Sequence, residues 1–447
     1  MASGRPMNSK RTMNGGSAGD LVAARSPFAG FGRRLAESWA FVRAGGRRPE
    51  SGNQLAYLFA PRRYFRESEP AADVFYLFRD VPERRETLRR LRAGEAGGLA
   101  AGQLFGFDAL RANGVAVDCN LRLPRIGSVR ETVAGWIEKA YAPRTGIGLG
   151  DVCSVRAHLW QMNRARVVVA TTDNTGLPAA RLKARGRLRA PLVYVSVGLP
   201  ERIESAAAIS PARAARYRKR LACVDRFVAY GYAEAEWLRR WLADPDKVRF
   251  VPFGVDPAQW RPEEGVAETT DVLGVGSDPQ RDFGLLLEYA RRHPEVGVGL
   301  VVGKDCAARL GPLPPNVDVR VQIPVAEVKR AIAAARAVVL PVKENTYSGA
   351  TTTLLQCMAM GKAVAVSRVG AIRAGYGFED GVNLRWMEPG SADSLAAAVD
   401  ALLADAAARR RIGAAARRHV EENLDWDRYV RGIERALAVG AETKEET

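Results

Sequence analysis

The chain has 447 residues, of which 47% are hydrophobic, enough to build two ordinary domains with packed cores. It carries 67 Lys and Arg against 50 Asp and Glu, and the formal charge of +17 favours acidic partners such as phosphorylated substrates, anionic lipid or nucleic acid. Nucleic acid is the weakest of these alternatives because the sequence has no zinc-finger spacing, RNP-like aromatic motif or lysine-rich tail, and no run of eighteen apolar residues predicts a transmembrane helix.

Residues 1–71 differ in composition from the rest and are expected to be a basic, disordered extension. No apolar signal peptide opens it. Its basic stretch 28–48 contains a candidate amphipathic helix at 28–44, whose apolar residues recur at three- and four-residue spacing: Phe31, Leu35, Trp39 and Val42. Such a helix favours contact with an anionic membrane surface. The alternatives are a helix packed on its own protein, a disordered tail and an organelle transit peptide.

Apolar runs and helical segments alternate from residue 72 to residue 253. The expected strands are continuous apolar runs at 74–78, 115–119, 167–171 and 191–198. Strands of this kind, separated by helices such as the one expected at 104–114, are typical of a parallel sheet that helices cover on both faces. We therefore expect a first Rossmann-like domain over 72–253.

The pattern restarts after VPFGVD (251–256), and we expect a hinge near 253–257. Further strands are expected at 271–276, 296–303, 317–322, 338–343 and 362–367. Residues 391–424 have the pattern of one long helical segment. These elements predict a second Rossmann-like domain over 254–430 and a tail at 431–447. The predicted fold class is therefore α/β, with two doubly wound domains that face a cleft, and ligands are expected at the carboxyl ends of the strands.

The stretch SGATTTLLQCMAMGKAVAV (348–366) joins one expected strand to a helix and then to the next strand. Gly349 allows close backbone approach, and Ser348, Thr351 and Thr352 can donate hydroxyl hydrogen bonds. Because free backbone N–H groups at a helix N-terminus attract phosphate, this turn is a candidate phosphate site. The alternative is an ordinary Ser and Thr cap.

Four motifs follow one another along the second half of the chain: VPFGVDPAQWRP, GVGSDPQRDFGLLL, SGATTTLLQCMAMGKAVAVS and DGVNLRWMEPGSADSLAAAV. Together they resemble the C-terminal donor domain of GT-B glycosyltransferases, particularly the retaining family 4 type, the glycosyl transferases of group 1. The resemblance covers roughly residues 215–430, whereas 72–214 match only in general architecture. It implies a GT-B fold with two Rossmann-like domains around a cleft.

The resemblance also implies a chemistry. The C-terminal domain would bind a nucleoside diphosphate sugar, and the N-terminal domain would bind the acceptor, which is a glycan, a lipid-linked sugar or a small metabolite. The sugar would be transferred with retention of anomeric configuration. The diphosphate leaving group would act as the local base, so neither a metal nor another cofactor is expected.

Matching positions imply a donor site made of ten residues: Gly276, Ser277, Arg281, Lys304, Ser348, Gly349, Ala350, Thr351, Thr352 and Gln356. The family has two Glu eight residues apart around the phosphate turn, and Ser348 and Gln356 stand at those positions here. Gln356 can still hold ribose hydroxyls through its carbonyl oxygen. Glu344, four residues before Ser348, is the catalytic candidate that would compensate for the missing carboxylate; the alternative is a solvated loop residue.

Negative charge builds on the diphosphate as the sugar leaves, so the site needs a cation. The family uses an Arg and a Lys in the first donor-domain turn. Ser277 stands at the Arg position here, and Arg281 falls close to the Lys position. Arg281 is the main catalytic candidate because a guanidinium can bind two phosphate oxygens, and the alternative is a surface Arg that opens a helix. Lys304 is the second candidate cation.

In the N-terminal domain, TTDNTGLP (171–178) follows an expected strand, and its Asp173 is the catalytic candidate on that side of the cleft. The alternative is an Asx-type turn. Many relatives have a His in such loops, but this sequence has three histidines, at 158, 293 and 419, and no His-based triad or metal cluster can be assembled from them. His158 is expected to be structural.

The five cysteines are scattered and form no CxxC pair. This argues against a disulfide framework or a zinc site and favours a reducing, cytoplasmic location. Peripheral association with the inner face of a membrane would follow if the basic extension binds lipid.

Two alternative functions remain open at this point. The first is a related GT-B enzyme that works differently, either an inverting transferase or a sugar-nucleotide epimerase, although an epimerase would need acidic and His residues that are scarce here. The second is a protein that binds a sugar nucleotide without transferring the sugar. Its motivation is that Ser348 and Gln356 stand where Glu is usual. Fold analogy cannot decide among them because function depends on the site.

Overall fold

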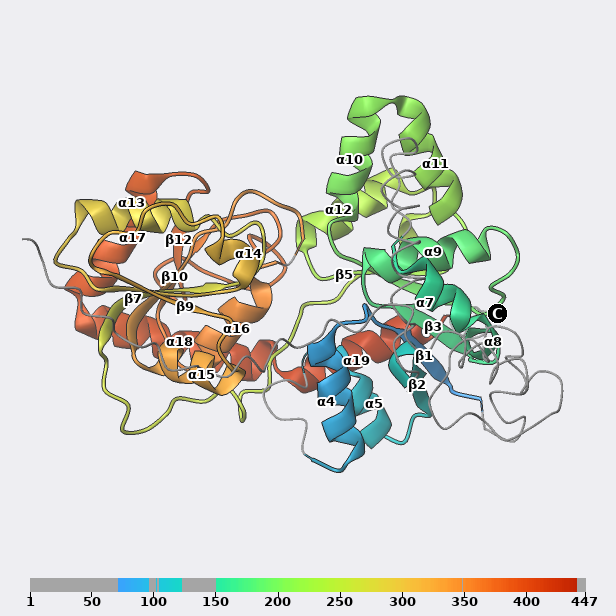
Figure 1. Cartoon of the computed structure of the whole chain (residues 1–447), viewed down its shortest axis with the longest axis horizontal. Helices are drawn as coiled ribbons and strands as arrows, with labels where there is room; N and C mark the ends of the chain where they lie inside the picture. Colours follow the sequence, from blue (N-terminus) through green and yellow to red (C-terminus); the bar gives the residue numbers. More distant parts are fainter. Residues whose placement is uncertain (1–70, 96–101, 103, 123–149, 348, 440–447) are drawn as a thin grey trace, which may run out of the picture.

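The computed structural model describes residues 71–95, 102, 104–122, 150–347 and 349–439. Apart from Ala71, the predicted extension with its candidate helix at 28–44 lies outside these residues, and so does Ser348. The described part contains two six-stranded parallel sheets with helices packed around each of them (Figure 1). This is the predicted α/β architecture.

The first sheet has the strand order β2-β1-β3-β4-β5-β6, and all its pairings are parallel. Its strands are β1 (Val74–Leu77), β2 (Val117–Cys119), β3 (Val167–Ala170), β4 (Leu192–Ser196), β5 (Arg226–Ala229) and β6 (Val248–Phe250). Strands β1, β3, β4 and β5 are buried along their whole length. Helices on both faces account for this burial, and for the continuous apolar runs in the sequence.

The helices of this domain are α4 (Pro82–Arg92), α5 (Phe107–Ala112), α7 (Val152–Ala157), α8 (Leu159–Met162), α9 (Asp173–Lys183), α10 (Leu199–Ile209), α11 (Pro211–Leu221) and α12 (Tyr232–Trp241). The described residues of this domain also form two short 3-10 helices, Asn120–Arg122 and Pro245–Lys247. Most of the segment 171–178 belongs to α9, which begins at Asp173. Gly176 lets this helix pack on the Tyr194 ring of β4, where an added Cβ would lie 2.3 Å from the ring.

The second sheet has the order β12-β11-β10-β7-β8-β9 and is also parallel. Its strands are β7 (Thr270–Gly276), β8 (Val298–Val302), β9 (Val317–Val321), β10 (Ala335–Leu340), β11 (Val364–Ser367) and β12 (Arg385–Met387). The helices around it are α13 (Phe283–Arg292), α14 (Lys304–Ala307), α15 (Val325–Ala333), α16 (Thr351–Ala359), α17 (Ala392–Ala404) and α18 (Ala406–Asn423).

The long helical segment expected at 391–424 is two helices. Asp405 separates α17 from α18, and its carboxylate accepts hydrogen bonds from the backbone N–H groups of Ala407 and Ala408, each at 2.9 Å. An Asp at this position satisfies the free donors of a helix start. The sequence pattern missed the break because alanine-rich sequence continues on both sides of it.

The last helix, α19 (Trp426–Leu437), crosses back onto the N-terminal domain and includes part of the segment predicted as a tail. The hydroxyls of Tyr429 and Tyr230 lie 2.9 Å apart, and Arg226 donates to the carbonyl of Arg435 at 3.3 Å. In Figure 1 this helix lies under the first sheet, near α4 and α5. One hydrophobic cluster therefore contains residues of both domains. None of the helices in the described part of the chain has the length and apolar character needed to cross a bilayer.

Candidate donor site between the two domains

The turn after β7 holds Arg281 in a defined position. Gly276 has a φ of +145°, and a Cβ at this residue would lie 2.4 Å from Nε of Arg281. Only glycine tolerates both the backbone conformation and the contact. The turn is also tied to the end of β10, because Lys343 N donates to Gln280 O and Asp282 N donates to Pro341 O, each at 2.9 Å. The turn that carries Arg281 therefore lies at the carboxyl ends of β7 and β10.

Arg281 is a buried cation, and two of its nitrogen atoms lack hydrogen-bond acceptors in the described part of the chain. Its side chain is 6% exposed, and its Nε and Nη1 atoms have no partner among the described residues. Burial lowers the pKa of Arg281, while the nearby Asp278 carboxylate opposes that shift. A buried charge without hydrogen bonds is costly. An entering anion would remove this cost, so the geometry favours an anion next to Arg281.

The start of α16 faces the same turn. A Cβ on Gly349 would lie 2.9 Å from Cγ of Asp278 and 2.9 Å from the Tyr347 ring, so the glycine permits close packing here. The Tyr347 hydroxyl donates to Asp278 at 3.0 Å, and Gln280 N donates to the same carboxylate at 2.8 Å. Burial and Asp278 raise the pKa of Tyr347. A carboxylate thus lies beside the helix N-terminus, whose free N–H groups favour negative charge.

The remaining donor-site candidates differ in exposure. Ala350 and Thr351 are buried at the start of α16, whereas Thr352 is exposed and Gln356 is half-buried one turn later. Ser277 is exposed and lies against Gly303, where an added Cβ would be 2.7 Å from the serine Cβ. Lys304 is exposed at the first position of the short helix α14. Ser348 lies outside the described residues.

Thr352 and Gln356 line a cavity of about 320 Å³ between the two domains. The opposite walls come from α5, from the segment 253–260 that joins the domains, and from α19. The lining includes Asp108, Asp256, Gln259, Trp260 and Trp426, so aromatic faces and hydrogen-bonding groups are both present. Ligand pockets typically combine these features, and this one opens beside the exposed face of α16.

Glu344 supports a neighbouring turn. Its Oε1 accepts a hydrogen bond from Gly370 N at 2.8 Å, in the loop that follows β11. The side chain is exposed apart from this contact. The structure thus gives Glu344 a definite partner in the C-terminal domain.

Glu201 was not singled out from the sequence, yet it joins the two domains. It lies in the first turn of α10, and its Oε1 accepts from the backbone N and the hydroxyl of Thr346, at 2.8 and 2.7 Å. Its Oε2 is buried and has no hydrogen-bond partner among the described residues. Close by, Gly231 lets the domain backbones meet, because a Cβ there would lie 2.1 Å from Thr346 O. Contacts with the N-terminal domain therefore help to position the loop before α16.

Asp173 lies deeper in the N-terminal domain than the sequence suggested. Its side chain is 2% exposed, and its carboxylate accepts from the Tyr194 hydroxyl at 3.0 Å and lies 3.2 Å from Arg202 Nε. Burial raises the pKa of Asp173 to about 6, with Arg202 and Tyr194 opposing the shift. Asp173 thus supports the β4–α10 turn that carries Glu201.

A second buried acid, Glu234, caps the same turn. It is fully buried, and its Oε1 accepts from the Ser196 hydroxyl at 2.6 Å and from Gly198 N at 2.9 Å. Burial raises the pKa of Glu234 to about 8. The sequence held no signal for this residue, because a Glu on an amphipathic helix is ordinarily exposed.

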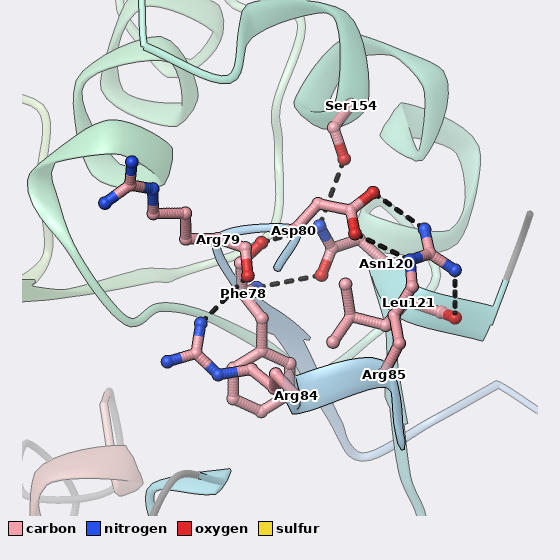
Figure 2. A network of polar contacts seen from close by, with 8 residues as sticks. All are labelled: Phe78, Arg79, Asp80, Arg84, Arg85, Asn120, Leu121 and Ser154. Atoms are coloured by element: carbon pink, nitrogen blue, oxygen red, sulfur yellow. Dashed lines mark hydrogen bonds and ion pairs between the residues drawn. The ribbon is translucent and has the colours of Figure 1, made fainter. Parts of the chain in front are cut away.

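The carboxyl end of β1 lies in a network of polar contacts in the N-terminal domain (Figure 2). Arg85 binds Asp80 with two hydrogen bonds, at 2.6 and 2.7 Å, and donates to Leu121 O at 3.1 Å. Asn120 links the backbone of Phe78 to the Ser154 hydroxyl. The loop between β1 and α4 is therefore fixed by side chains from three segments.

The residues with metal-binding side chains do not gather in this region. Within the described ranges, no group of three or more His, Cys, Asp or Glu has the geometry of a metal site. His158 is buried with its Nδ1 2.8 Å from Ser154 O, and burial lowers its pKa to about 4. It therefore serves packing in the N-terminal domain.

Comparisons with known proteins agree with this architecture. The family described as glycosyl transferases group 1 matches residues 287–405. Sucrose-phosphate synthase from Thermosynechococcus elongatus has a similar structure, with a TM-score of 0.60 and 16% identity over 81% of this chain and 97% of that one. Anabaena HepE in complex with UDP-glucose is also similar, with a TM-score of 0.58 and 16% identity over 83% of this chain and 99% of that one. A search of curated proteins finds no match.

These findings confirm the predicted GT-B fold and the predicted resemblance to group 1 glycosyltransferases. The matched segment runs from α13 to the end of α17 and includes α16. This segment of the C-terminal domain thus matches the glycosyl transferases group 1 family, and the turn that holds Arg281 lies shortly before the matched residues.

Proposed function

We propose that this chain is a glycosyltransferase that moves a sugar from a nucleoside diphosphate sugar to an acceptor bound in the cleft between its domains. The observation that carries the proposal is Arg281, a buried guanidinium with two nitrogen atoms that lack hydrogen-bond acceptors. It lies beside the N-terminus of α16, so a cation and a helix start converge on the same space. That combination suits a diphosphate.

In the proposed complex the diphosphate lies between Arg281 and the start of α16. The Asp278 carboxylate now lies against Gly349, so it has to move away from the helix start when the anion enters. Tyr347 would then lose its present acceptor and become free to donate to a phosphate or sugar oxygen. The nucleoside would extend into the cavity lined by Thr352 and Gln356, where the glutamine can bind ribose hydroxyls.

The proposed reaction breaks the bond between the anomeric carbon and the diphosphate oxygen. The electron pair goes to that oxygen, and Arg281 stabilises the charge that develops there. The acceptor hydroxyl oxygen forms the new bond to the anomeric carbon, and its proton passes to the departing diphosphate. Attack from the face that the diphosphate leaves gives retention. Arg281 and the helix supply the positive charge, so this scheme requires no metal ion.

A sugar-containing molecule is the proposed acceptor, and the N-terminal face of the cleft is its proposed binding surface. Structural neighbours supply a first donor to test, because Anabaena HepE has been crystallised with UDP-glucose. UDP and UDP-glucose are therefore the first ligands to examine.

Calorimetric titration of the protein with UDP, GDP and ADP, without added metal, tests the donor site. We expect one nucleotide to bind, and the Arg281→Met variant to lose that binding. Arg330→Ala, an exposed arginine on α15, is the matched control and should bind normally. A hundredfold excess of ligand over Kd should also raise the free energy of unfolding by about 2.7 kcal/mol.

Turnover is measured separately, as release of the nucleoside diphosphate from its sugar conjugate with a panel of sugar acceptors. Binding followed by acceptor-dependent release supports the proposal. Binding without release over the panel would point to a sugar-nucleotide binding protein. Failure of all three nucleotides to bind would refute the donor site.

A further inference from the structure

The hairpin of α10 and α11 projects from the N-terminal domain, away from the second sheet (Figure 1). Its corner, SAAAISPA (205–212), contains no charged residue. Ile209 at the end of α10 is 64% exposed, more than any other large hydrophobic side chain in the described ranges. Ala208, Pro211 and Ala212 beside it are exposed as well. The corner is therefore an apolar tip at the edge of the molecule.

Helix α11 places positive charge next to this tip. It contains five cations and no acidic residue: Arg213, Arg216, Arg218, Lys219 and Arg220. Tyr217 and Leu221 are buried and anchor its inner face. On the outer face Arg216 and Lys219 are exposed, and neither forms an ion pair with a described residue. Arg218 lies 5.1 Å above the Trp241 ring, which holds its charge near the same surface.

We propose that this corner docks on an anionic lipid bilayer. Ile209 and its apolar neighbours would enter the headgroup region, while Arg216 and Lys219 face lipid phosphates. A bilayer offers both an apolar layer and a layer of negative charge, and the hairpin presents matching groups in the same order. A nucleic-acid backbone would match the cations but leave the apolar tip without a partner.

The direction of α10 links this surface to the cleft. The helix begins beside Glu201 at the domain interface and ends at Ile209, and its eleven residues span roughly 16 Å. When the tip is docked on a membrane, the cleft would therefore lie within reach of an acceptor sugar that projects from a lipid of that membrane. This consequence depends on the proposed transferase function, whereas docking itself does not.

Vesicle sedimentation with the full chain tests the docking. Vesicles of phosphatidylcholine alone are compared with vesicles that also contain phosphatidylglycerol, and an RNA duplex serves as a competitor. Charge removal in Arg216→Gln/Lys219→Gln should weaken partition into anionic vesicles by about 5-fold for each cation, or roughly 30-fold together. Ile209→Ser should weaken it by about 10-fold through lost apolar contact.

Arg410→Gln/Arg418→Gln on α18 is the control, because it removes the same charge from exposed positions in the other domain. The proposal expects this control to bind like the unmodified protein, and all variants to keep their nucleotide affinity. The proposal would be overturned if the Ile209 and the Arg216/Lys219 variants bound anionic vesicles as well as the unmodified protein does. A loss that the α18 control shares would also overturn it, as would RNA binding that depends on these residues without any vesicle binding.

Discussion

Arg281 is a buried guanidinium whose charge should make the protein without a bound ligand less stable. The fold places its guanidinium under the sheet edge by means of Gly276, which has no side chain and adopts a positive φ. Nothing in the described part of the chain satisfies Nε or Nη1. Such a charge is costly to bury unless it is paired. The arrangement is therefore understandable as a site prepared for an anion.

Replacing this charge with an apolar side chain of similar length should stabilise the empty protein. We expect Arg281→Met to raise the free energy of unfolding by about 1–3 kcal/mol, because the variant no longer buries an unpaired cation. Urea denaturation without ligand measures the change. Arg281→Lys, which keeps a buried charge, should give no such gain. A destabilised methionine variant would mean that the guanidinium has a structural partner after all.

The buried acids of the β4–α10 turn predict a dependence on pH. Burial raises the pKa of Glu234 to about 8 and of Asp173 to about 6. Above roughly pH 4.5 the unfolded chain has released these protons, whereas the folded protein retains them until the pH exceeds the raised values. The folded state thus binds more protons between these limits. Its free energy of unfolding should therefore fall as pH rises towards 8.

Glu234→Gln should remove much of this dependence. Its amide oxygen can still accept from Ser196 and Gly198, but the residue no longer titrates. We expect the loss of stability from about pH 5.5 to 8.5 to be shallower by up to roughly 1 kcal/mol per pH unit. Urea denaturation at several pH values gives the slopes. Glu236→Gln, on the same helix, is the control, and identical slopes for all three proteins would contradict the assignment.

At the scale of secondary-structure elements, the loop before α16 is the point where the two domains meet near the proposed donor site. Glu201 of α10 accepts two hydrogen bonds from Thr346, and Ala233 N at the start of α12 donates to Gly370 O at 3.4 Å. Glu344 fixes the same Gly370 from the other side. The position of this loop therefore depends on both domains being together.

Glu201→Ala should weaken donor binding although the residue lies in the other domain. It removes two hydrogen bonds to the charged carboxylate, each contributing on the order of 1 kcal/mol. We expect the Kd for the nucleotide to rise about 10-fold, as measured by calorimetric titration. Glu201→Gln keeps an acceptor oxygen and should restore most of the affinity. Glu204→Ala, one turn along α10, serves as the control. Unchanged affinity in Glu201→Ala would show that the loop is positioned without this contact.

The elements differ in how well their sequence predicts them. Strands such as β3 and β4 are continuous apolar runs, so they were predicted almost to the residue. The start of α16 was predicted from Gly349 and its neighbouring hydroxyl residues, whereas Arg281 was singled out because the family resemblance places it close to the family's Lys position. Glu201 and Glu234 could not be predicted in this way. Their environments arise from packing between segments far apart in the chain, which leaves no local pattern in the sequence.

The whole molecule is held together by the chain crossing between its domains twice. The segment around Phe253 leads out of the first domain, and α19 returns to it. Aromatic rings from both crossings pack together, with Phe253 and Tyr429 centroids 4.9 Å apart and Trp426 and Tyr429 centroids 4.8 Å apart. Backbone pairing between Val255 and Asp425 adds to this junction. The two domains share one hydrophobic cluster as a result.

We therefore expect the two domains to unfold in one cooperative transition, and removal of α19 to separate them. Truncation after Leu424 would expose the apolar surfaces of Tyr230 and Phe253, which α19 now covers. The N-terminal domain should then unfold first, because it loses a helix from its core while the second sheet keeps its own helices. Differential scanning calorimetry should show one transition for the full chain and two for the truncated one.

Tyr429→Phe is the control for this truncation. It removes one hydroxyl contact with Tyr230 and keeps the packing, so it should lower Tm slightly and preserve the single transition. Two transitions in the full chain would show that α19 does not couple the domains.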